Sequence, residues 1–135
     1  MWKGKLVLKG AESVHDVEKA YQLGLDGVIV SNHGGRQVDV GQATIDSLNT
    51  IVPLYKGKLT VMMDSGIRGG ADVARVMASG ADFSFMGRTF MYGVSALGKK
   101  GGNHTVSMLK QQLTQVMEQM SCAEIQDLQT KLITK

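Results

Sequence analysis

Apolar residues gather in four short runs along the chain, and these runs predict strands. The first three runs are continuous rather than alternating, which is typical of a parallel sheet that is covered on both faces. The four runs are "KLVLK" (Lys5–Lys9), "GVIVS" (Gly27–Ser31), "LTVMMD" (Leu59–Asp64) and "FSFM" (Phe83–Met86). We therefore expect four buried parallel strands.

Between and after these runs, apolar residues recur with the spacing of a helix. Ser13–Leu23 has apolar residues on one face, with Ser13 as its N-cap and Gly24 after its end. The other expected helices are Gln42–Ile51, ended near Pro53, Gly70–Ser79, ended by Gly80, a short stretch near Thr89–Leu97, and a longer helix with Val106, Leu109, Leu113, Val116 and Met120 in phase. "SCAE" (Ser121–Glu124) predicts a capping box that opens a last short helix.

The resulting order is β-α-β-α-β-α-β-α, which implies right-handed parallel crossovers. Two α/β architectures fit this order: part of a (β/α)8 barrel, or a small open doubly wound sheet. The chain shows no linker, and its 135 residues are enough for a real core. We therefore expect residues 1–135 to form a single domain.

Composition narrows the classes of function. The net charge is +3 and the basic residues are scattered apart from Lys99-Lys100, so nothing indicates a nucleic-acid partner, whereas acidic or phosphorylated small molecules stay open as ligands. The single cysteine, Cys122, excludes an internal disulfide framework and fits a reducing compartment. No apolar run approaches the roughly 20 residues that span a bilayer, and no signal peptide is visible, so we expect a cytoplasmic protein. Cys, His and carboxylate residues show no metal-site spacing.

Polar residues or glycine stand at the carboxyl end of every predicted strand. Lys9, Ser31 and Asp64 end the first three strands, and Gly87 follows the fourth. In α/β folds this end of the sheet is where ligands bind. The sequence therefore predicts a ligand site that is built from these four strand ends.

The segment "SNHGGRQVD" (Ser31–Asp39) carries the candidate chemistry. His33 is of the type that serves as a general base near neutral pH, and Arg36 offers a planar fork that fits a carboxylate. Both can point into one pocket if the two glycines between them turn the chain sharply. Together they indicate proton abstraction from a small acid. The alternative is a solvated polar loop with an incidental histidine, which is the commoner case for an arbitrary sequence.

Two glycine-rich turns, "DSGIRGG" (Asp64–Gly70) and "GRT" (Gly87–Thr89), are candidate anion sites. Such turns expose backbone N–H groups at helix starts, and Arg68 and Arg88 add positive charge. In barrels a phosphate site often lies in the loops after the last two strands, which are the strands concerned here. From spacing alone, ordinary turn glycines with surface arginines are equally open, and neither turn matches the P-loop or G-x-G-x-x-G pattern.

Taken together, "LVLKG", "GLDGVIVSNHGGRQVD", "DSGIRGGADVARVMASGA" and "MGRTFMYG" resemble the FMN-dependent α-hydroxy-acid dehydrogenases and oxidases. This family includes L-lactate dehydrogenases, glycolate oxidase, lactate oxidase and mandelate dehydrogenase. The similarity runs from about Lys5 to the C-terminal helix, and the motifs occur in the family order. It implies the C-terminal half of a (β/α)8 TIM barrel, strands five to eight of the family, with four parallel β/α units plus C-terminal helices. It also implies the cofactor FMN and oxidation of an L-2-hydroxy acid, such as lactate, to the 2-oxo acid.

The resemblance implies a role for each matching residue. Lys9 would contact the pyrimidine edge of the flavin and stabilise negative charge on reduced FMN, and Ser31 would touch the flavin ring. His33 would take a proton from the substrate, and Arg36 would bind the substrate carboxylate beside it. The ribityl and phosphate groups of FMN would be bound by Asp64, Gly66, Arg68, Gly87 and Arg88.

The sequence also departs from the family. The first half of the family barrel supplies a tyrosine near the substrate, a second carboxylate-binding arginine and an aspartate that orients the histidine, and none of these maps here. Gly69 stands where many relatives carry a second arginine. A half barrel leaves open strand edges and uncovered barrel-facing side chains, so we expect a homo-oligomer, such as a dimer that restores eight strands. Two alternatives to an active enzyme stay open. The chain is a half barrel that binds FMN or phosphate with little or no turnover, or it is a folded remnant without function.

Overall fold

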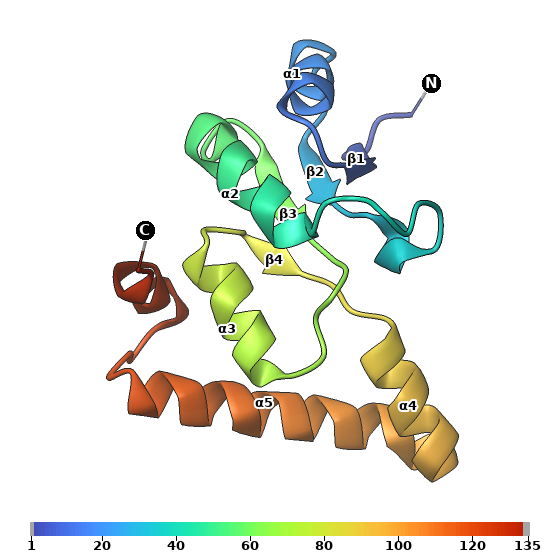
Figure 1. Cartoon of the computed structure of the whole chain (residues 1–135), viewed down its shortest axis with the longest axis vertical. Coiled ribbons are helices and arrows are strands. Elements are labelled where there is room, and N and C mark those ends of the chain that lie inside the picture. The colour runs from blue at the N-terminus through green and yellow to red at the C-terminus, as the bar shows by residue number, and fades with distance from the viewer. Residues whose placement is uncertain (1, 134–135) are drawn as a thin grey trace.

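The computed structural model describes residues 2–133 and contains a four-stranded parallel sheet (Figure 1). Its strands are β1 (Val7–Ala11), β2 (Gly27–Val30), β3 (Thr60–Met63) and β4 (Phe83–Ser84). The α-helices are α1 (Val14–Gln22), α2 (Thr44–Tyr55), α3 (Gly70–Ala78), α4 (Arg88–Leu97) and α5 (Gly101–Gln119), and the 3-10 helices are η1 (His33–Gly35), η2 (Gly98–Lys100) and η3 (Ile125–Lys131).

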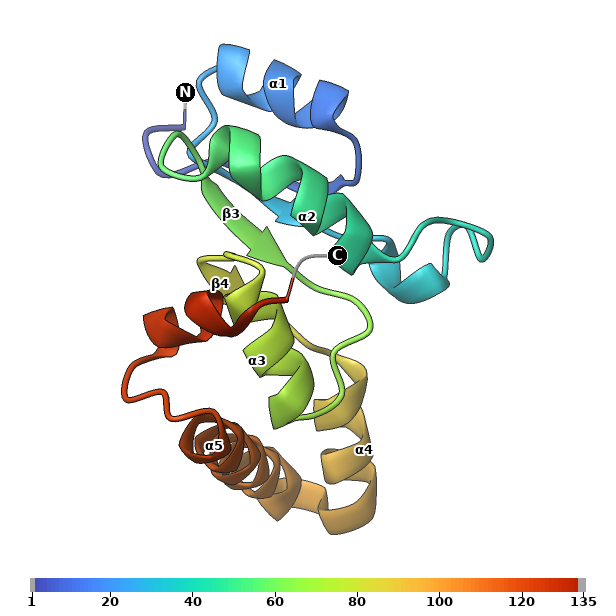
Figure 2. The same cartoon turned by 60° about the vertical axis from the view of Figure 1, so that its left-hand side comes forward.

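The strand order β1-β2-β3-β4 decides between the two architectures that the sequence left open. Each strand pairs in parallel with the next strand along the chain. Right-handed crossovers that all step in one direction place the helices on one face of the sheet, whereas a doubly wound sheet reverses its direction and has helices on both faces. Figure 2 shows α1 and α2 side by side over the strands. The sheet is therefore a segment of a barrel wall, as the resemblance implies.

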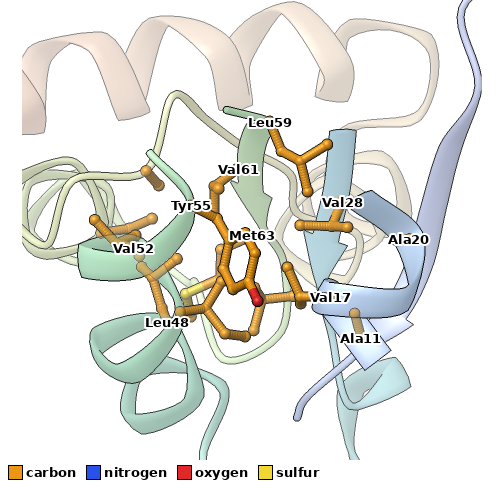
Figure 3. Close-up of a cluster of buried hydrophobic side chains, with 14 of the residues drawn as sticks. Ala11, Val17, Ala20, Val28, Leu48, Val52, Tyr55, Leu59, Val61 and Met63 are labelled. Carbon is orange, nitrogen blue, oxygen red and sulfur yellow. The ribbon is translucent and has the colours of Figure 1, made fainter. Parts of the chain in front are cut away.

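The hydrophobic core lies between the sheet and its helices (Figure 3). Four side chains of the two central strands are almost fully buried there: Val28, Val30, Val61 and Met63. The first two helices supply Val17, Ala20, Leu48, Ile51, Val52 and Tyr55 to the same cluster. Burial of a large apolar side chain stabilises a fold by about 1.5–3 kcal/mol, so this layer accounts for much of the stability of the chain.

The opposite face of the sheet is much less covered. We call it the inner face and define it by Val7, Ile29, Met62, Phe83 and Phe85. Because residues two apart on a strand share a face, these side chains point away from the core. Ile29 and Met62 are half-buried, whereas Phe83 is 56 % exposed and Phe85 is 41 % exposed. Apolar side chains on this face are therefore left without a packing layer from the described residues.

The first and last strands differ from their predictions. β1 begins two residues later and ends two residues later than predicted, so Lys9 lies inside the strand rather than at its end, and the register with β2 shifts between Lys9 and Ala11. The expectation of burial is wrong for this strand, since Val7 and Leu8 are 39 % and 36 % exposed. The reason is that β1 is an edge strand, so it has a neighbouring strand on one side only. β4 retains only the first two residues of its predicted range.

Helix α2 extends beyond its predicted end. It continues from Ile51 through Pro53 to Tyr55, although proline lacks the N–H group that a helix interior uses. Val52 and Tyr55 are 9 % and 4 % exposed, so burial of the last turn offsets the lost hydrogen bond. The prediction for α1 is confirmed: Ser13 Oγ accepts a hydrogen bond from the N–H of Asp16 at 3.1 Å.

The C-terminal helices pack against α3 rather than against the sheet. The apolar positions predicted to be in phase in the long helix are unequally covered. Leu109 is buried, whereas Val106 is 44 % exposed and Met120, the residue after the end of α5, is 41 % exposed. The capping box lies one turn later than predicted, between Glu124 and Asp127 at the start of η3. Within residues 2–133, the helices are either too short or too polar to cross a membrane.

Candidate active site

A cleft of about 370 Å³ opens at the carboxyl ends of the strands. Its volume falls in the range of small-molecule sites. Of the nine residues that the sequence nominated, the cleft is lined by Lys9, His33, Arg36, Asp64, Gly66, Arg68, Gly87 and Arg88. The ninth, Ser31, is 1 % exposed and lies beneath the cleft. The structure therefore brings together Lys9 of β1 and residues from the segments that follow β2, β3 and β4.

An ion pair forms the floor of the cleft. Lys9 Nζ lies 2.8 Å from Asp64 Oδ2 and donates a hydrogen bond of 2.8 Å to Ser31 Oγ. The Lys9 side chain is 45 % exposed, whereas that of Asp64 is 17 % exposed. The ammonium group can therefore reach a ligand in the cleft without leaving the carboxylate.

The Asp64 carboxylate is held in its charged form. Burial works to raise its pKa, but hydrogen bonds from Lys9, Ser31 and Ser65 and the positive charge of Lys9 outweigh burial and lower the pKa below its ordinary value. A charged carboxylate is a stronger hydrogen-bond acceptor for ligand hydroxyl groups than a neutral group.

The loop that carries His33 turns as sharply as its glycines predict. His33, Gly34 and Gly35 have φ values of 55°, 71° and 73°, all in the left-handed region. Asn32 Oδ1 accepts hydrogen bonds from the N–H groups of Gly34 at 3.0 Å and Gly35 at 3.2 Å. Because this asparagine side chain satisfies the amides of η1, the turn is stable without a longer helix.

His33 and Arg36 present their side chains to the cleft. Both residues are exposed, and among residues 2–133 neither side chain makes a hydrogen bond or ion pair. The His33 imidazole lies against Gly10, where an added Cβ atom would come within 2.8 Å of His33 Cε1. Gly10 has φ +94°, so glycine is required here for both backbone conformation and space.

The other end of the cleft is rich in anion-binding groups. Arg68 Nη1 donates to the carbonyl of Ile67 at 3.0 Å, and Arg88 Nη2 donates to the carbonyl of Gly34. Helix α4 starts at this end, and its N-cap, Gly87, supplies no side-chain cap. A Cβ atom added at Gly66 or Gly87 would meet no atom within 4 Å, so the backbone is open to the cleft. Two guanidinium groups and an uncapped helix start can bind a phosphate group.

Three residues that shape the site were not predicted from the sequence. Asn32 caps the turn, Gly10 leaves room for the imidazole, and Ser65 accepts a hydrogen bond from the N–H of Gly34 at 3.1 Å. An asparagine directly before two glycines is a recognisable turn signal and could have been found. No local signal marks Ser65 or Gly10, since both act on a loop that is distant in sequence.

The arrangement brings an exposed imidazole, an exposed guanidinium and the groups of a candidate anion site to one cleft. It offers no metal centre within the described part of the chain, where no three His, Cys, Asp or Glu side chains gather. The chemistry that these residues can support is binding of an anionic ligand and transfer of a proton beside it.

Comparison with known sequences identifies the family of the chain. The profile of the family described as FMN-dependent dehydrogenase matches residues 1–135. The L-lactate dehydrogenase of Bartonella quintana is 43 % identical over 116 residues, which cover 86 % of this chain and 30 % of that protein. An FMN-dependent alpha-hydroxy acid dehydrogenase of Schizosaccharomyces pombe is 44 % identical over 108 residues, which cover 80 % of this chain and 26 % of that protein.

Solved structures show the same relation in space. A mandelate oxidase with 3,3-difluoro-2-hydroxy-3-phenylpropionic acid matches with a TM-score of 0.91 and 34 % identity, covering 99 % of this chain and 40 % of that one. A soluble mutant of the membrane-associated (S)-mandelate dehydrogenase from Pseudomonas putida matches with a TM-score of 0.88 and 36 % identity. The match covers 94 % of this chain and 36 % of that one. The chain thus spans about a third of the length of these relatives, and its sheet is a partial barrel. The chain belongs to the FMN-dependent dehydrogenase family.

Proposed function

We propose that this chain is part of an enzyme that uses FMN to oxidise a lactate-like L-2-hydroxy acid to the 2-oxo acid. The observation that carries the proposal is the convergence of His33, Arg36 and the Lys9–Asp64 pair on one cleft. Relatives that are L-lactate dehydrogenases support a small hydroxy acid as the substrate class.

The donor set of the cleft fits FMN. The phosphate group of FMN is an anion, and it matches Arg68, Arg88 and the uncapped start of α4. The open space above Gly66 and Gly87 would let the phosphate approach the backbone closely. At the other end, Lys9 would donate to the polar edge of the flavin ring, and Asp64 would accept from the ribityl hydroxyl groups.

The residues of this chain would divide the reaction between them. The oxidation removes two electrons and two protons from the substrate, and FMN, when bound, would supply the acceptor for both electrons and one of the protons. Arg36 binds the substrate carboxylate through its planar fork, which orients the hydroxyl-bearing carbon toward His33. An unprotonated imidazole nitrogen of His33 takes one proton from the substrate. The Lys9 ammonium group, which is paired with Asp64, would stabilise negative charge that develops on the flavin.

A second candidate function is binding of FMN or phosphate with little or no turnover. The observation that favours it is the isolation of the His33 imidazole, which has no carboxylate partner among residues 2–133. A histidine without an orienting acceptor is a weaker and less directed base. The candidate anion-binding groups Arg68, Gly87 and Arg88, by contrast, all lie in this chain.

Titration of the purified chain with FMN, followed by visible absorption, tests both functions. We expect a shifted flavin band that saturates, and an affinity that falls by about tenfold or more in Arg68→Met, because a charged hydrogen bond to the phosphate is lost. Arg75→Met is the matched control. It removes the same charge from a surface ion pair with Asp72, outside the cleft.

Addition of L-lactate to the FMN complex separates the two functions. Bleaching of the flavin band without oxygen would support the enzyme, and an unbleached complex would support binding alone. An unchanged free-flavin spectrum at all concentrations would contradict both. A loss of affinity in Arg75→Met equal to that in Arg68→Met would contradict the assignment of the phosphate end.

We also propose that the inner face and the open edges of β1 and β4 mediate association of two copies of this chain. Exposed Phe83 and Phe85 on this face make burial favourable. In a dimer with its two-fold axis along the barrel, β4 of each copy would pair in parallel with β1 of the other, and all helices would remain outside.

Light scattering across a range of concentrations tests this association. We expect a dimer that dissociates in Phe83→Lys, because a charge would be placed on the apolar face. A parent chain that stays monomeric at every concentration would contradict the proposal.

A further inference from the structure

Two serine hydroxyl groups hold the backbone of the His33 loop. Ser31 Oγ accepts a hydrogen bond from the N–H of His33 at 3.1 Å, and Ser65 Oγ accepts one from the N–H of Gly34 at 3.1 Å. Two successive amides of the loop are therefore bound by side chains that come from different β/α units.

Both hydroxyl groups also contact the ion pair on the cleft floor. Lys9 Nζ donates to Ser31 Oγ at 2.8 Å, and Ser65 Oγ donates to Asp64 Oδ1 at 2.8 Å. A serine hydroxyl can donate one hydrogen bond while it accepts another, so Ser65 can serve Gly34 and Asp64 at once. Its hydroxyl is thus a direct link between the carboxylate and the loop.

The backbone of Ser65 is unfavourable for any residue with a side chain. Its φ of 77° lies in the left-handed region, which glycine adopts freely and serine does not. Backbone strain of this kind is found mainly where the surrounding structure requires it for function. The presence of a serine where glycine would be relaxed points to a need for its hydroxyl group.

We propose that Ser65 is a positioning residue for His33. By accepting the N–H of Gly34 and donating to Asp64, its hydroxyl holds the loop after β2 against the loop after β3 and keeps His33 in its left-handed conformation over the cleft. The proposal rests on the proposed function in taking His33 as the base. The contact itself can be measured without flavin or substrate.

The loop would loosen without Ser65, but it would not collapse. The N–H of Gly34 also donates to Asn32 Oδ1 at 3.0 Å, and the carbonyl of Ser65 accepts from Thr44 Oγ1 at 3.4 Å. These contacts remain when the hydroxyl is removed. Variants at position 65 are therefore expected to fold, with a change that is confined to the two loops.

Amide hydrogen exchange of the 135-residue chain, measured residue by residue by NMR, tests the proposal. The variants are Ser65→Ala, which removes the hydroxyl and keeps the backbone strain, and Ser65→Gly, which removes both. Ser13→Ala is the matched control. It deletes a serine hydroxyl that accepts a backbone N–H at the start of α1, far from the loop in sequence.

We expect exchange of the Gly34 amide to rise by roughly tenfold in both Ser65 variants, because about one net hydrogen bond is lost. The imidazole signals of His33 should shift in the same two variants. Ser65→Gly should be at least as resistant to urea as Ser65→Ala, so that the loss of protection follows the hydroxyl and not the global stability. Ser13→Ala should lose stability while Gly34 keeps its parental exchange rate.

The proposal would be overturned if Gly34 exchanged at the parental rate in both Ser65 variants. It would also be overturned if Ser13→Ala accelerated the same amide to the same extent, since the effect would then be global. A parent chain that fails to bind FMN contradicts the proposed function alone, because the exchange experiment contains no flavin.

Discussion

The two faces of the β-sheet differ although they are built from the same strands. In β3, Met63 points to the helices and is 3 % exposed, whereas Met62 points to the inner face and is only half-buried. In β2, Val28 and Val30 are fully buried, and Ile29 between them is not. The helix-covered face is a finished core, and the inner face is an apolar surface without a second layer.

This difference separates the part of the sheet that stabilises the chain from the part beside the candidate site. The helices α1, α2 and α3 each lie between two consecutive strands in the chain and cover the outer face by local connections. The inner face of a barrel is filled by strands on the other side, which must come from elsewhere. The candidate site lies at the rim of this uncovered face, so its cleft is complete only on the side that this chain supplies.

The largest expected effect comes from a pair of adjacent methionines. Met63→Ala should lower the free energy of unfolding by about 2–5 kcal/mol, because a buried side chain leaves a cavity. Met62→Ala should cost much less in the monomer, since its side chain is already partly in water. Urea denaturation measures both values. Equal losses would show that the inner face is covered in solution.

A smaller effect is expected from two glycines with the same backbone conformation. Gly10 has φ +94° and Gly24 has φ +76°, so alanine should cost about 1–2 kcal/mol of stability at either position. Only Gly10→Ala should also move the His33 imidazole, because the new Cβ would contact Cε1, whereas Gly24 has no atom within 4 Å of an added Cβ. NMR signals of His33 that shift equally in both variants would contradict this contact.

The smallest expected effect is the pH dependence that Asp64 contributes. Its pKa in the folded chain is lower than in the unfolded chain, so its stabilising contribution is fully present above the ordinary carboxyl pKa. The contribution is lost as pH falls through the lower, folded pKa. Urea denaturation of the parent and of Asp64→Asn at about pH 5 and near pH 3 should show a smaller loss of stability on acidification in the variant. An identical loss in both chains would show that other carboxyl groups account for the pH dependence.

Much of the fold could be predicted from local patterns. Continuous apolar runs identified the positions of β2 and β3, and helix spacing identified α1, α3 and α4. The end of α2 could not be predicted, because Pro53 argues locally against a helix that burial of Tyr55 maintains. The exposure of β1 was missed for a similar reason, since a pattern that is typical of burial does not say whether a neighbouring layer is present.

Sequence alone determined which residues stand at or just after the strand ends, because a strand and the residues that follow it are consecutive in the chain. Their positions and side-chain chemistry were therefore enough to nominate His33, Arg36, Arg68 and Arg88 as site residues. Only the tertiary structure decided that Ser65 holds Gly34, which lies 31 residues away, and that Gly10 makes room for His33. These contacts depend on the register of β1, β2 and β3, and register is set by packing between elements rather than by any one segment.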